Sequence, residues 1–356
     1  MKIWIDILTP KQVLFLGALA TRLQKAGHEI FLTTRRYREV NQLLETKGYK
    51  AKLVGEHGGA SIFSKLTASA LRVAFLAKHV RQVKPSLAVS FSSVEASRVA
   101  FGLSIPHYCV SDSPHAVAVS KLSVPLSKRL FTPWIIPKDV WTRFGISNER
   151  IITYRAIDPV VWIRGFRPNE RVLKELNLKK DNPIVTVRPE ETYAAYMLQE
   201  NVGQRSVTED VVQNLLKFGK DLQIVIVGRY DKEFVNKWRR FGRQVRVTKS
   251  IIDGPSLVAH SSLFIGAGGT MTAEAALLGV PTVSIYPGQP TFIEEYLIKI
   301  GLIHRSLNPR RLTSASIKMM SDVNFLRKHR AMSKRFLRSM EDPIAKIVSS
   351  LERLER

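Results

Sequence analysis

Two doubly wound α/β domains, each built on a mostly parallel sheet, are the fold that this sequence predicts. Three observations support the prediction. Short apolar runs alternate with helical patterns along most of the chain, which is typical of βαβ units. A proline-rich stretch at 121–168 interrupts this alternation, and a second alternation follows it. The length of 356 residues also fits two domains better than one.

In the first half, apolar runs of strand length are separated by longer helical patterns. Glycine follows three of these patterns, at Gly27, Gly48 and Gly102, and glycine readily ends a helix. The expected strands cover 2–7, 29–33, 52–54, 87–91, 107–110 and 151–154. The expected helices cover 13–26, 37–47, 64–83 and 95–101.

The second half repeats the pattern. Its expected strands cover 184–187, 223–227, 244–247, 263–265 and 282–286, and its expected helices cover 209–218, 232–241, 272–278 and 292–300. A basic helical tail follows from about 311 onward. The predicted domains are therefore 1–166 and 167–320, and the basic C-terminal helices at 321–356 are candidates to pack back on the first domain.

The charge balance is the unusual part of the composition. The chain carries 55 Lys and Arg residues against 30 Asp and Glu residues, a net charge of +25. Such a surplus favours a polyanionic partner, either nucleic acid, an anionic membrane or a phosphate-bearing substrate. The single cysteine, Cys109, excludes an internal disulfide and suits a reducing compartment. Because no uncharged run of 18 residues and no export signal occurs, the expected location is the cytoplasm.

The clearest motif lies where the strand at 263–265 runs into Gly266-Ala267-Gly268-Gly269 and a helix opens. Glycines let a backbone approach a phosphate closely, and the N–H groups and dipole of the helix favour the anion. The spacing matches neither the dinucleotide fingerprint nor the Walker A motif. The alternative interpretation is a tight strand-to-helix turn. Glu274, further into the helix, could accept hydrogen bonds from ribose hydroxyls or could simply complement the helix dipole.

Several further motifs share a pattern with one family. They are Trp4–Gln12, Gly55-Glu56-His57-Gly58-Gly59, Arg98–Leu103, Asp112-Ser113-Pro114, Val187–Glu190 and the run from Gly268 to Pro281. With them, nearly the whole chain resembles an uncharacterised prokaryotic family of predicted GT-B-fold glycosyltransferases. This family is related to the UDP-N-acetylglucosamine 2-epimerases and to the lipid-intermediate N-acetylglucosaminyltransferases. The resemblance implies two Rossmann-like domains facing across a cleft, with the acceptor in the first and the nucleotide sugar in the second.

The resemblance also implies a donor site. Gly268, Gly269 and Thr270 would hold the diphosphate, and Glu274 the ribose. Other candidates follow strands of the predicted sheets: Arg188, Arg229 and Lys11.

The arginine at 188 could neutralise phosphate, since its fork matches phosphate oxygens, or form an ion pair with Glu190 or Glu191. Arg229 could border the nucleobase of the donor. Many enzymes of this fold carry a glycine-rich loop with a histidine after the first strand. Here Lys11 and Gln12 stand there, and Lys11 either faces a phosphate or is a solvated lysine.

Candidate acids and bases follow three successive strands of the first half. They are His57, Glu95, Asp112 and His115. An inverting transfer needs a general base for the acceptor hydroxyl, and Asp112 is the first choice, then His57. The alternatives are a turn cap for Asp112, a hydrogen-bonded structural histidine for His57 and a carboxylate at a helix start for Glu95. The 2-epimerases that the chain resembles use acidic residues in corresponding loops to eliminate and re-add UDP, and the resemblance places Glu95 and Asp112 where such carboxylates would lie.

The stretch from His57 to Val94 contains no acid and five basic residues, namely Lys65, Arg72, Lys78, Arg81 and Lys84. Interleaved apolar residues make it a basic amphipathic helix that could contact an anionic membrane on its inner face. The alternative is a core-packed helix with a solvated cationic face. No nucleic-acid-binding motif accompanies the charge, so binding of nucleic acid rests on charge alone.

The expected function is a metal-independent glycosyltransferase that moves a sugar from a UDP-sugar to an acceptor, for which a lipid-linked molecule is a candidate. No metal-ligand spacing and no Asp-x-Asp motif occurs in the sequence, and no cofactor is expected. The alternatives are an epimerase of the same fold and a non-enzymatic nucleic-acid-binding protein.

Overall fold

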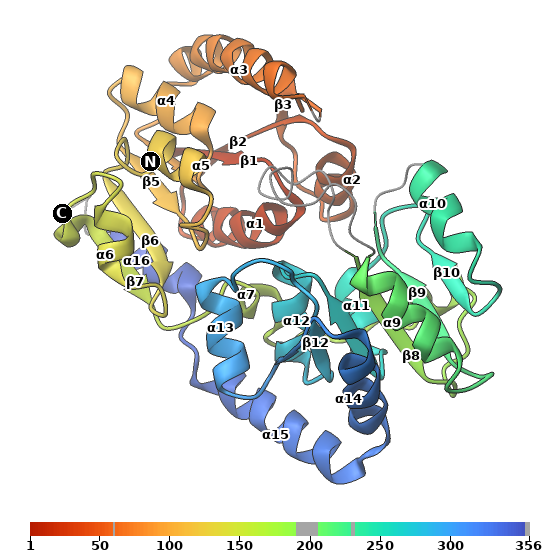
Figure 1. Ribbon diagram of the computed structural model, residues 1–356. Helices are drawn as coiled ribbons and strands as arrows, with labels where there is room; N and C mark the ends of the chain where they lie inside the picture. Colours follow the sequence, from red (N-terminus) through yellow and green to blue (C-terminus); the bar gives the residue numbers. More distant parts are fainter. Residues whose placement is uncertain (60, 190–205, 229–231, 353–356) are drawn as a thin grey trace. The chain divides into compact units, whose positions relative to one another are not determined.

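A computed structural model describes residues 1–59, 61–189, 206–228 and 232–352. The chain divides into two compact units. Unit 1 comprises Met1–Trp162 and Met340–Arg356, and unit 2 comprises Ile163–Ser339. Each unit contains one sheet in which all neighbouring strands are parallel, with helices between successive strands (Figure 1). The predicted α/β class with two doubly wound sheets is confirmed.

Unit 1 contains a seven-stranded sheet in the order β3-β2-β1-β4-β5-β6-β7. The strands are β1 Lys2–Ile7, β2 Glu29–Arg36, β3 Lys52–Glu56, β4 Leu87–Ser90, β5 His107–Val110, β6 Arg129–Pro133 and β7 Ile151–Tyr154. The strand order reverses between β1 and β4, so the loops after these two strands flank the switch point at which ligands of such sheets bind. The sequence analysis missed β6, because it lies in the proline-rich stretch and itself ends at a proline.

The helices of unit 1 cover the faces of this sheet, and some begin at polar side-chain caps. The helices are α1 Pro10–Lys25, α2 Arg38–Thr46, α3 Ile62–Val83, α4 Val94–Gly102, α5 Val117–Ser123, α6 Lys138–Thr142, the 3₁₀ turn η1 Asn148–Arg150, α7 Val160–Ile163 at the unit boundary, and α16 Pro343–Glu352. Thr9, Ser61 and Ser93 each accept a hydrogen bond from a backbone N–H in the first turn of the helix that follows. Helices α1 and α2 cover one face of the sheet, and α3 and α4 cover the other (Figure 1).

Unit 2 repeats this plan with six strands in the order β10-β9-β8-β11-β12-β13. The strands are β8 Ile184–Arg188, β9 Gln223–Ile226, β10 Val245–Val247, β11 Leu263–Gly266, β12 Thr282–Ser284 and β13 His304–Arg305. The helices are α8 Arg171–Glu175, α9 Val207–Leu216, α10 Lys232–Arg239, α11 Gly254–Ala259, α12 Thr270–Leu278, α13 Phe292–Lys299, α14 Pro309–Ser321 and α15 Val323–Ser339.

Alternate residues of the unit 2 strands form two cores, one on each face of the sheet. Val185 and Ile265 pack in the cluster that contains Leu215 of α9 and Leu312 of α14. Ile184 lies on the opposite face, with Leu257 of α11. This period of two, with apolar residues on both faces, is what a parallel strand buried by helices on each side requires.

The basic tail is divided between the units. Helix α15 packs on α12 in unit 2, where Ser333 donates to the carbonyl of Leu277 over 2.8 Å. From Met340 onward the chain belongs to unit 1, and α16 contacts α1. Asp342 forms an ion pair of 3.1 Å with Arg22 of α1. Among the described residues, no helix combines the length and apolar content needed to cross a bilayer.

Candidate functional site

The start of α1 and two loops at the carboxyl edge of the unit 1 sheet bring charged side chains together around Lys11. This lysine lies in the first turn of α1, Asp112 follows β5 and Asp158 follows β7. The Lys11 ammonium contacts a carboxylate oxygen of Asp112 and lies 2.6 Å from Oδ2 of Asp158. It also lies 4.4 Å from the centre of the Phe91 ring. The lysine therefore joins two carboxylates that are distant in the sequence.

Hydroxyl groups complete this arrangement. Ser113 Oγ donates to Oδ1 of Asp112 over 2.8 Å, and the Tyr154 hydroxyl donates to Oδ1 of Asp158. We use the name Lys11 cluster for Lys11, Asp112, Ser113, Tyr154 and Asp158. The side chains of Lys11 and Asp112 are 15% and 13% exposed, whereas that of Asp158 is fully buried. Asp112 is thus the carboxylate that a ligand could reach, and Asp158 lies beneath it.

The two carboxylates differ in their affinity for a proton. Burial, together with the charge of Asp112, raises the pKa of Asp158 to about 6 against the opposing effect of Lys11. Burial also acts on Asp112, but the charge and hydrogen bond of Lys11 outweigh it and hold the pKa of Asp112 below its usual range. The pKa of Lys11 is raised, because its two carboxylates outweigh the effect of burial. The cluster therefore holds an ionised Asp112, the form that accepts a proton.

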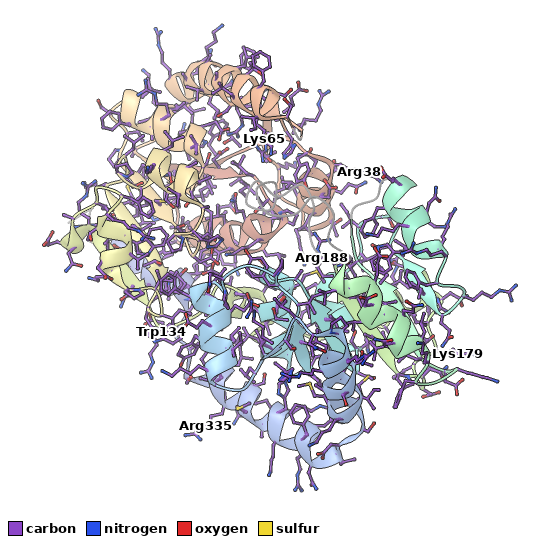
Figure 2. The ribbon with its side chains drawn as sticks, in the orientation of Figure 1. Arg38, Lys65, Trp134, Lys179, Arg188 and Arg335 are labelled. Atoms are coloured by element: carbon purple, nitrogen blue, oxygen red, sulfur yellow. The ribbon has the colours of Figure 1, made fainter. Side chains whose placement is uncertain are left out.

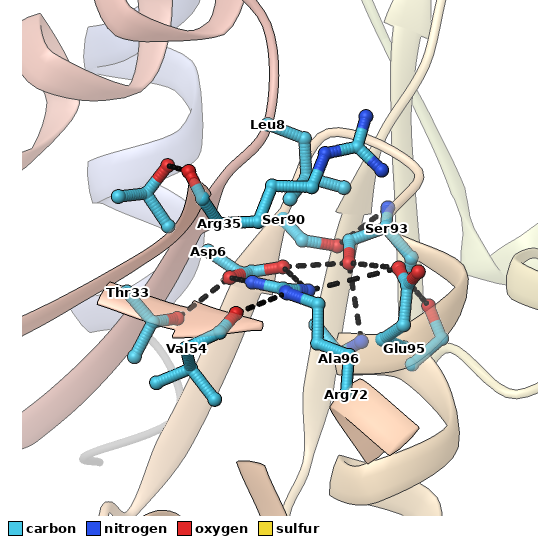
Figure 3. Close-up of polar contacts among 12 residues, drawn as sticks. Asp6, Leu8, Thr33, Arg35, Val54, Arg72, Ser90, Ser93, Glu95 and Ala96 are labelled. Carbon is cyan, nitrogen blue, oxygen red and sulfur yellow. Dashed lines mark hydrogen bonds and ion pairs between the residues drawn. The ribbon is translucent and has the colours of Figure 1, made fainter. Parts of the chain in front are cut away.

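A second cluster of buried charges lies beneath the switch point of unit 1 (Figure 3). Asp6 of β1 accepts two hydrogen bonds from Arg72 of α3, of 3.0 and 2.6 Å. Thr33 and Ser93 each donate to Asp6 over 2.6 Å. Glu95 lies 3.7 Å from Arg72 and is also buried. These five residues are the Asp6 cluster, and they link β1, β2, α3 and the start of α4.

The Asp6 cluster changes the interpretation of two residues. Glu95 was a candidate acid, and in the structure its carboxylate lies beside the Arg72 guanidinium rather than in the Lys11 cluster. Arg72 was one of the five basic residues of the helix predicted to contact a membrane. That was wrong for Arg72, because its side chain is fully buried and donates to Asp6. A sequence cannot reveal this pair, since 66 positions separate its members.

The two histidines lie on exposed loops. His57 stacks on Tyr37 with ring centres 4.8 Å apart, and its Nδ1 accepts a hydrogen bond from the backbone of Gly59. His115 is exposed three residues after Asp112. Of the four predicted acid–base candidates, only Asp112 thus belongs to the Lys11 cluster. Its role as a base, and that of Lys11 at a phosphate, stay predictions.

In unit 2, the glycine run forms the N-terminus of α12. Gly268 and Gly269 have φ angles of +79° and +84°, in the left-handed region that favours glycine. A Cβ atom at Gly268 would lie 3.2 Å from the Tyr286 ring. In the part of the chain that the structure describes, no side chain caps α12, whose N-cap is Gly269. Thr270 is the first residue of the helix, and the first N–H groups there are suited to an anion.

The other donor-site candidates differ in their surroundings. Glu274 lies in the second turn of α12 and is 4% exposed. Arg188 ends β8, and its Nη1 donates to the carbonyl of Val227 over 3.2 Å (Figure 2). Arg229 lies outside the described residues, as do Glu190 and Glu191. The role of each at a donor stays a prediction.

The sequence analysis missed two groups. Asp158 lies in the proline-rich stretch at 121–168 and was not singled out, although it follows the strand at 151–154 as Asp112 follows 107–110. Glu294 stands three residues after Thr291, a spacing typical of a capping box, yet its carboxylate accepts a hydrogen bond from Ser284 at the end of β12. Burial raises the pKa of Glu294. Among the described residues, no group of three His, Cys, Asp or Glu side chains could hold a metal ion.

Solved structures show the fold that these two units share with other proteins. The structure of MnaA with UDP from S. aureus matches with a TM-score of 0.75, at 13% identity over 99% of this chain and 96% of that one. The UDP-GlcNAc 2-epimerase of Methanocaldococcus jannaschii matches with a TM-score of 0.71, at 15% identity over 99% and 100%. The glycosyltransferase VinC in complex with dTDP matches with a TM-score of 0.66, at 14% identity over all of both chains. The fold is therefore GT-B-like.

The sequence comparisons identify the family. The uncharacterised protein MJ0665 of Methanocaldococcus jannaschii is 33% identical over 314 residues, which cover 85% of this chain and 87% of the relative. The model of a family described as a protein of unknown function, DUF354, matches residues 1–353. The chain belongs to the DUF354 family.

Proposed function

We propose that this protein is a glycosyltransferase that moves a sugar from a UDP-sugar to an acceptor hydroxyl without a metal ion. The observation that carries the proposal is the N-terminus of α12, where two left-handed glycines precede a helix whose N-cap lacks a side chain. Such an N-terminus stabilises a diphosphate both as ligand and as leaving group. The GT-B-like fold, which the chain shares with enzymes that handle nucleotide sugars, supports the same assignment.

The proposal assigns donor binding to unit 2 and proton transfer to unit 1. Gly268, Gly269 and Thr270 bind the diphosphate, Arg188 adds positive charge and Glu274 contacts the ribose. Asp112, ionised through its contact with Lys11, accepts the proton of the acceptor hydroxyl. The hydroxyl oxygen attacks the anomeric carbon, and the bond to the diphosphate breaks with its electron pair on UDP.

A 2-epimerase is the second candidate, and the Lys11 cluster is the observation that favours it. One carboxylate there is held ionised and its neighbour is biased toward its protonated form. An enzyme that removes and returns a proton on a sugar carbon needs groups of both kinds. The epimerases with this fold give the candidate further support.

Calorimetry with UDP, UDP-N-acetylglucosamine, UDP-glucose, GDP-mannose and a short DNA duplex tests the donor. We expect one uridine nucleotide to bind at micromolar affinity with little dependence on salt. Binding of the duplex alone, with affinity that falls steeply as salt rises, would contradict the proposal and favour nucleic acid as the partner.

Nuclear magnetic resonance of the bound nucleotide sugar then separates the two enzymes. An epimerase converts UDP-N-acetylglucosamine to its 2-epimer with no acceptor present. A transferase leaves the sugar configuration unchanged until an acceptor is added. Conversion without an acceptor would replace our first candidate with the second.

A further inference from the structure

Helix α3 exposes large apolar side chains on the surface of unit 1. Ile62, Phe63, Leu66, Leu71 and Phe75 are between 47% and 79% exposed. The same helix supplies Leu76 and Val80 to the core, and Leu71 and Phe75 lie on the side away from Val80, whereas Ile62 and Leu66 are exposed in the first turns of the helix. Isolated exposed apolar residues are ordinary on protein surfaces, but five on one helix are not. The exposed side of α3 therefore has the composition of a contact surface.

A groove of about 310 Å³ adjoins this helix. It lies between α3 and β3, which is the edge strand of the sheet. Its apolar lining comes from Leu53, Ala68, Leu71 and Phe75, while Arg36 and Glu56 form the polar part. Leu53 is itself about half exposed. The groove thus extends the apolar surface from the helix onto the edge of the sheet.

The same helix is cationic. No acid occurs between Glu56 and Glu95 in the sequence. Lys78 and Arg81 are exposed on α3, and Lys84 is exposed at its C-cap. Leu71, Phe75 and Lys78 follow the spacing i, i+4, i+7 and so share one face of the helix. Lys65, in the first turn, is partly exposed (Figure 2). Apolar and positively charged side chains therefore lie together on α3, and Glu56 in the lining of the groove is an acid beside them.

Helix α15 of unit 2 serves as an internal comparison. It carries many basic residues, including exposed Arg327 and Lys328. Among the described residues of this helix, however, Val323 is the one large apolar side chain that is exposed. Charge alone is thus common in this protein, and α3 differs by combining charge with apolar exposure.

We propose that the exposed face of α3, with the adjoining groove, is a docking surface for an anionic lipid bilayer. Phe63, Leu71 and Phe75 enter the interfacial region, while Lys78, Arg81 and Lys84 contact headgroup phosphates. This chemistry fits a bilayer, because a bilayer offers an apolar interior directly beneath a layer of negative charge. The proposal goes beyond the reaction proposed above and does not depend on it, since docking is measured without substrate.

Sedimentation of the full chain with lipid vesicles tests the proposal. We expect at least ~10-fold stronger partitioning onto phosphatidylcholine vesicles that contain phosphatidylglycerol than onto phosphatidylcholine alone, and weaker partitioning as salt rises from ~0.05 to ~0.5 M. The double variant Phe63→Ser with Leu71→Ser should lose about 10-fold or more of this partitioning. Both side chains are exposed, so the fold should survive, and circular dichroism checks this.

Charge variants on the two helices give the matched control. Lys78→Glu with Arg81→Glu should reduce binding to anionic vesicles about 10-fold or more, with little effect on the weak binding to neutral ones. Arg327→Glu with Lys328→Glu makes the same charge change on α15 and should reduce binding to anionic vesicles far less. An equal loss from both pairs, or unchanged binding of the apolar double variant, would overturn the proposal. A dimer in sedimentation velocity that the apolar double variant abolishes would also overturn it, in favour of a second copy of the chain as the partner.

Discussion

The helices that follow β4 and β11 occupy the same place in the two units, because each begins directly after the strand across the switch point. They start very differently. The N-cap of α4 is Ser93, whose hydroxyl accepts from the backbone of Ala96 and donates to Asp6. The N-cap of α12 is Gly269, which has no side chain to offer. One helix start is saturated by the protein itself, and the other is available to an anion.

This difference indicates that one fold plan serves two chemical tasks. In unit 1, pairs of buried charged side chains lie at the edge of the sheet and can hold or release protons. In unit 2 the corresponding edge presents backbone N–H groups, which are suited to an anion and do not titrate. The predictions below test each side of this comparison.

The largest effect is expected from Asp112→Asn. An amide at this position cannot take up the proton of the acceptor hydroxyl. Turnover should therefore fall ~10²–10⁴-fold while donor affinity stays nearly unchanged. Asp139→Asn removes an exposed acid of α6 and is the matched control. Steady-state rates and calorimetry of the same preparations provide the measurement. Full activity in a correctly folded Asp112→Asn protein would exclude Asp112 as the base.

Arg72→Met should strongly destabilise unit 1, because it leaves the carboxylate of Asp6 buried without its partner. Breaking one side of a buried ion pair typically costs about 3–5 kcal/mol. Lys78→Met on the exposed side of the same helix should change the free energy of unfolding by less than about 0.5 kcal/mol. Urea unfolding followed by circular dichroism compares the two. Equal stabilities would mean that the Asp6 cluster contributes little to folding.

Gly268→Ala should weaken binding of UDP. The alanine must adopt a positive φ, at a cost of about 1–3 kcal/mol, and its Cβ presses on the Tyr286 ring. Movement of the loop to relieve this contact should reduce affinity about 10-fold. Gly219→Ala, at a position with open space and no positive φ, is the control and should bind normally. Unaltered affinity for UDP in Gly268→Ala would remove the glycine run from the donor site.

The last prediction concerns pH. The pKa of Asp158 is raised from 3.8 to about 6, so between these values the folded protein holds a proton that the unfolded chain releases. Its contribution to stability is therefore present at low pH and is lost as pH rises toward 6. The pKa of Asp112 is lowered, so its contribution to stability is instead lost as pH falls. We expect that Asp158→Asn removes the loss of folding stability between pH 3.8 and about 6. Urea unfolding across this pH range measures it. The same pH profile in variant and parent would contradict this assignment.

The parts of the structure that the sequence predicted are those defined by local pattern. The strand, glycine run and helix at 263–278 are continuous in the sequence, so their local arrangement was accessible. The Lys11 cluster is not local, because its charged members come from the start of α1 and from the loops after β5 and β7. The sequence alone therefore left Lys11 open to interpretation as a solvated lysine, and Asp158 was one residue of the proline-rich stretch. Arg72 was misplaced for the same reason, since only the folded sheet brings it to Asp6.

The return of the chain to unit 1 at Met340 has a consequence for synthesis on the ribosome. Unit 2 is a single continuous stretch, so its strands and helices are translated before Met340. The surface of α1 that α16 covers therefore stays open until α16 has emerged from the ribosome. The packing of unit 1 is thus completed only after the whole of unit 2 has been synthesised.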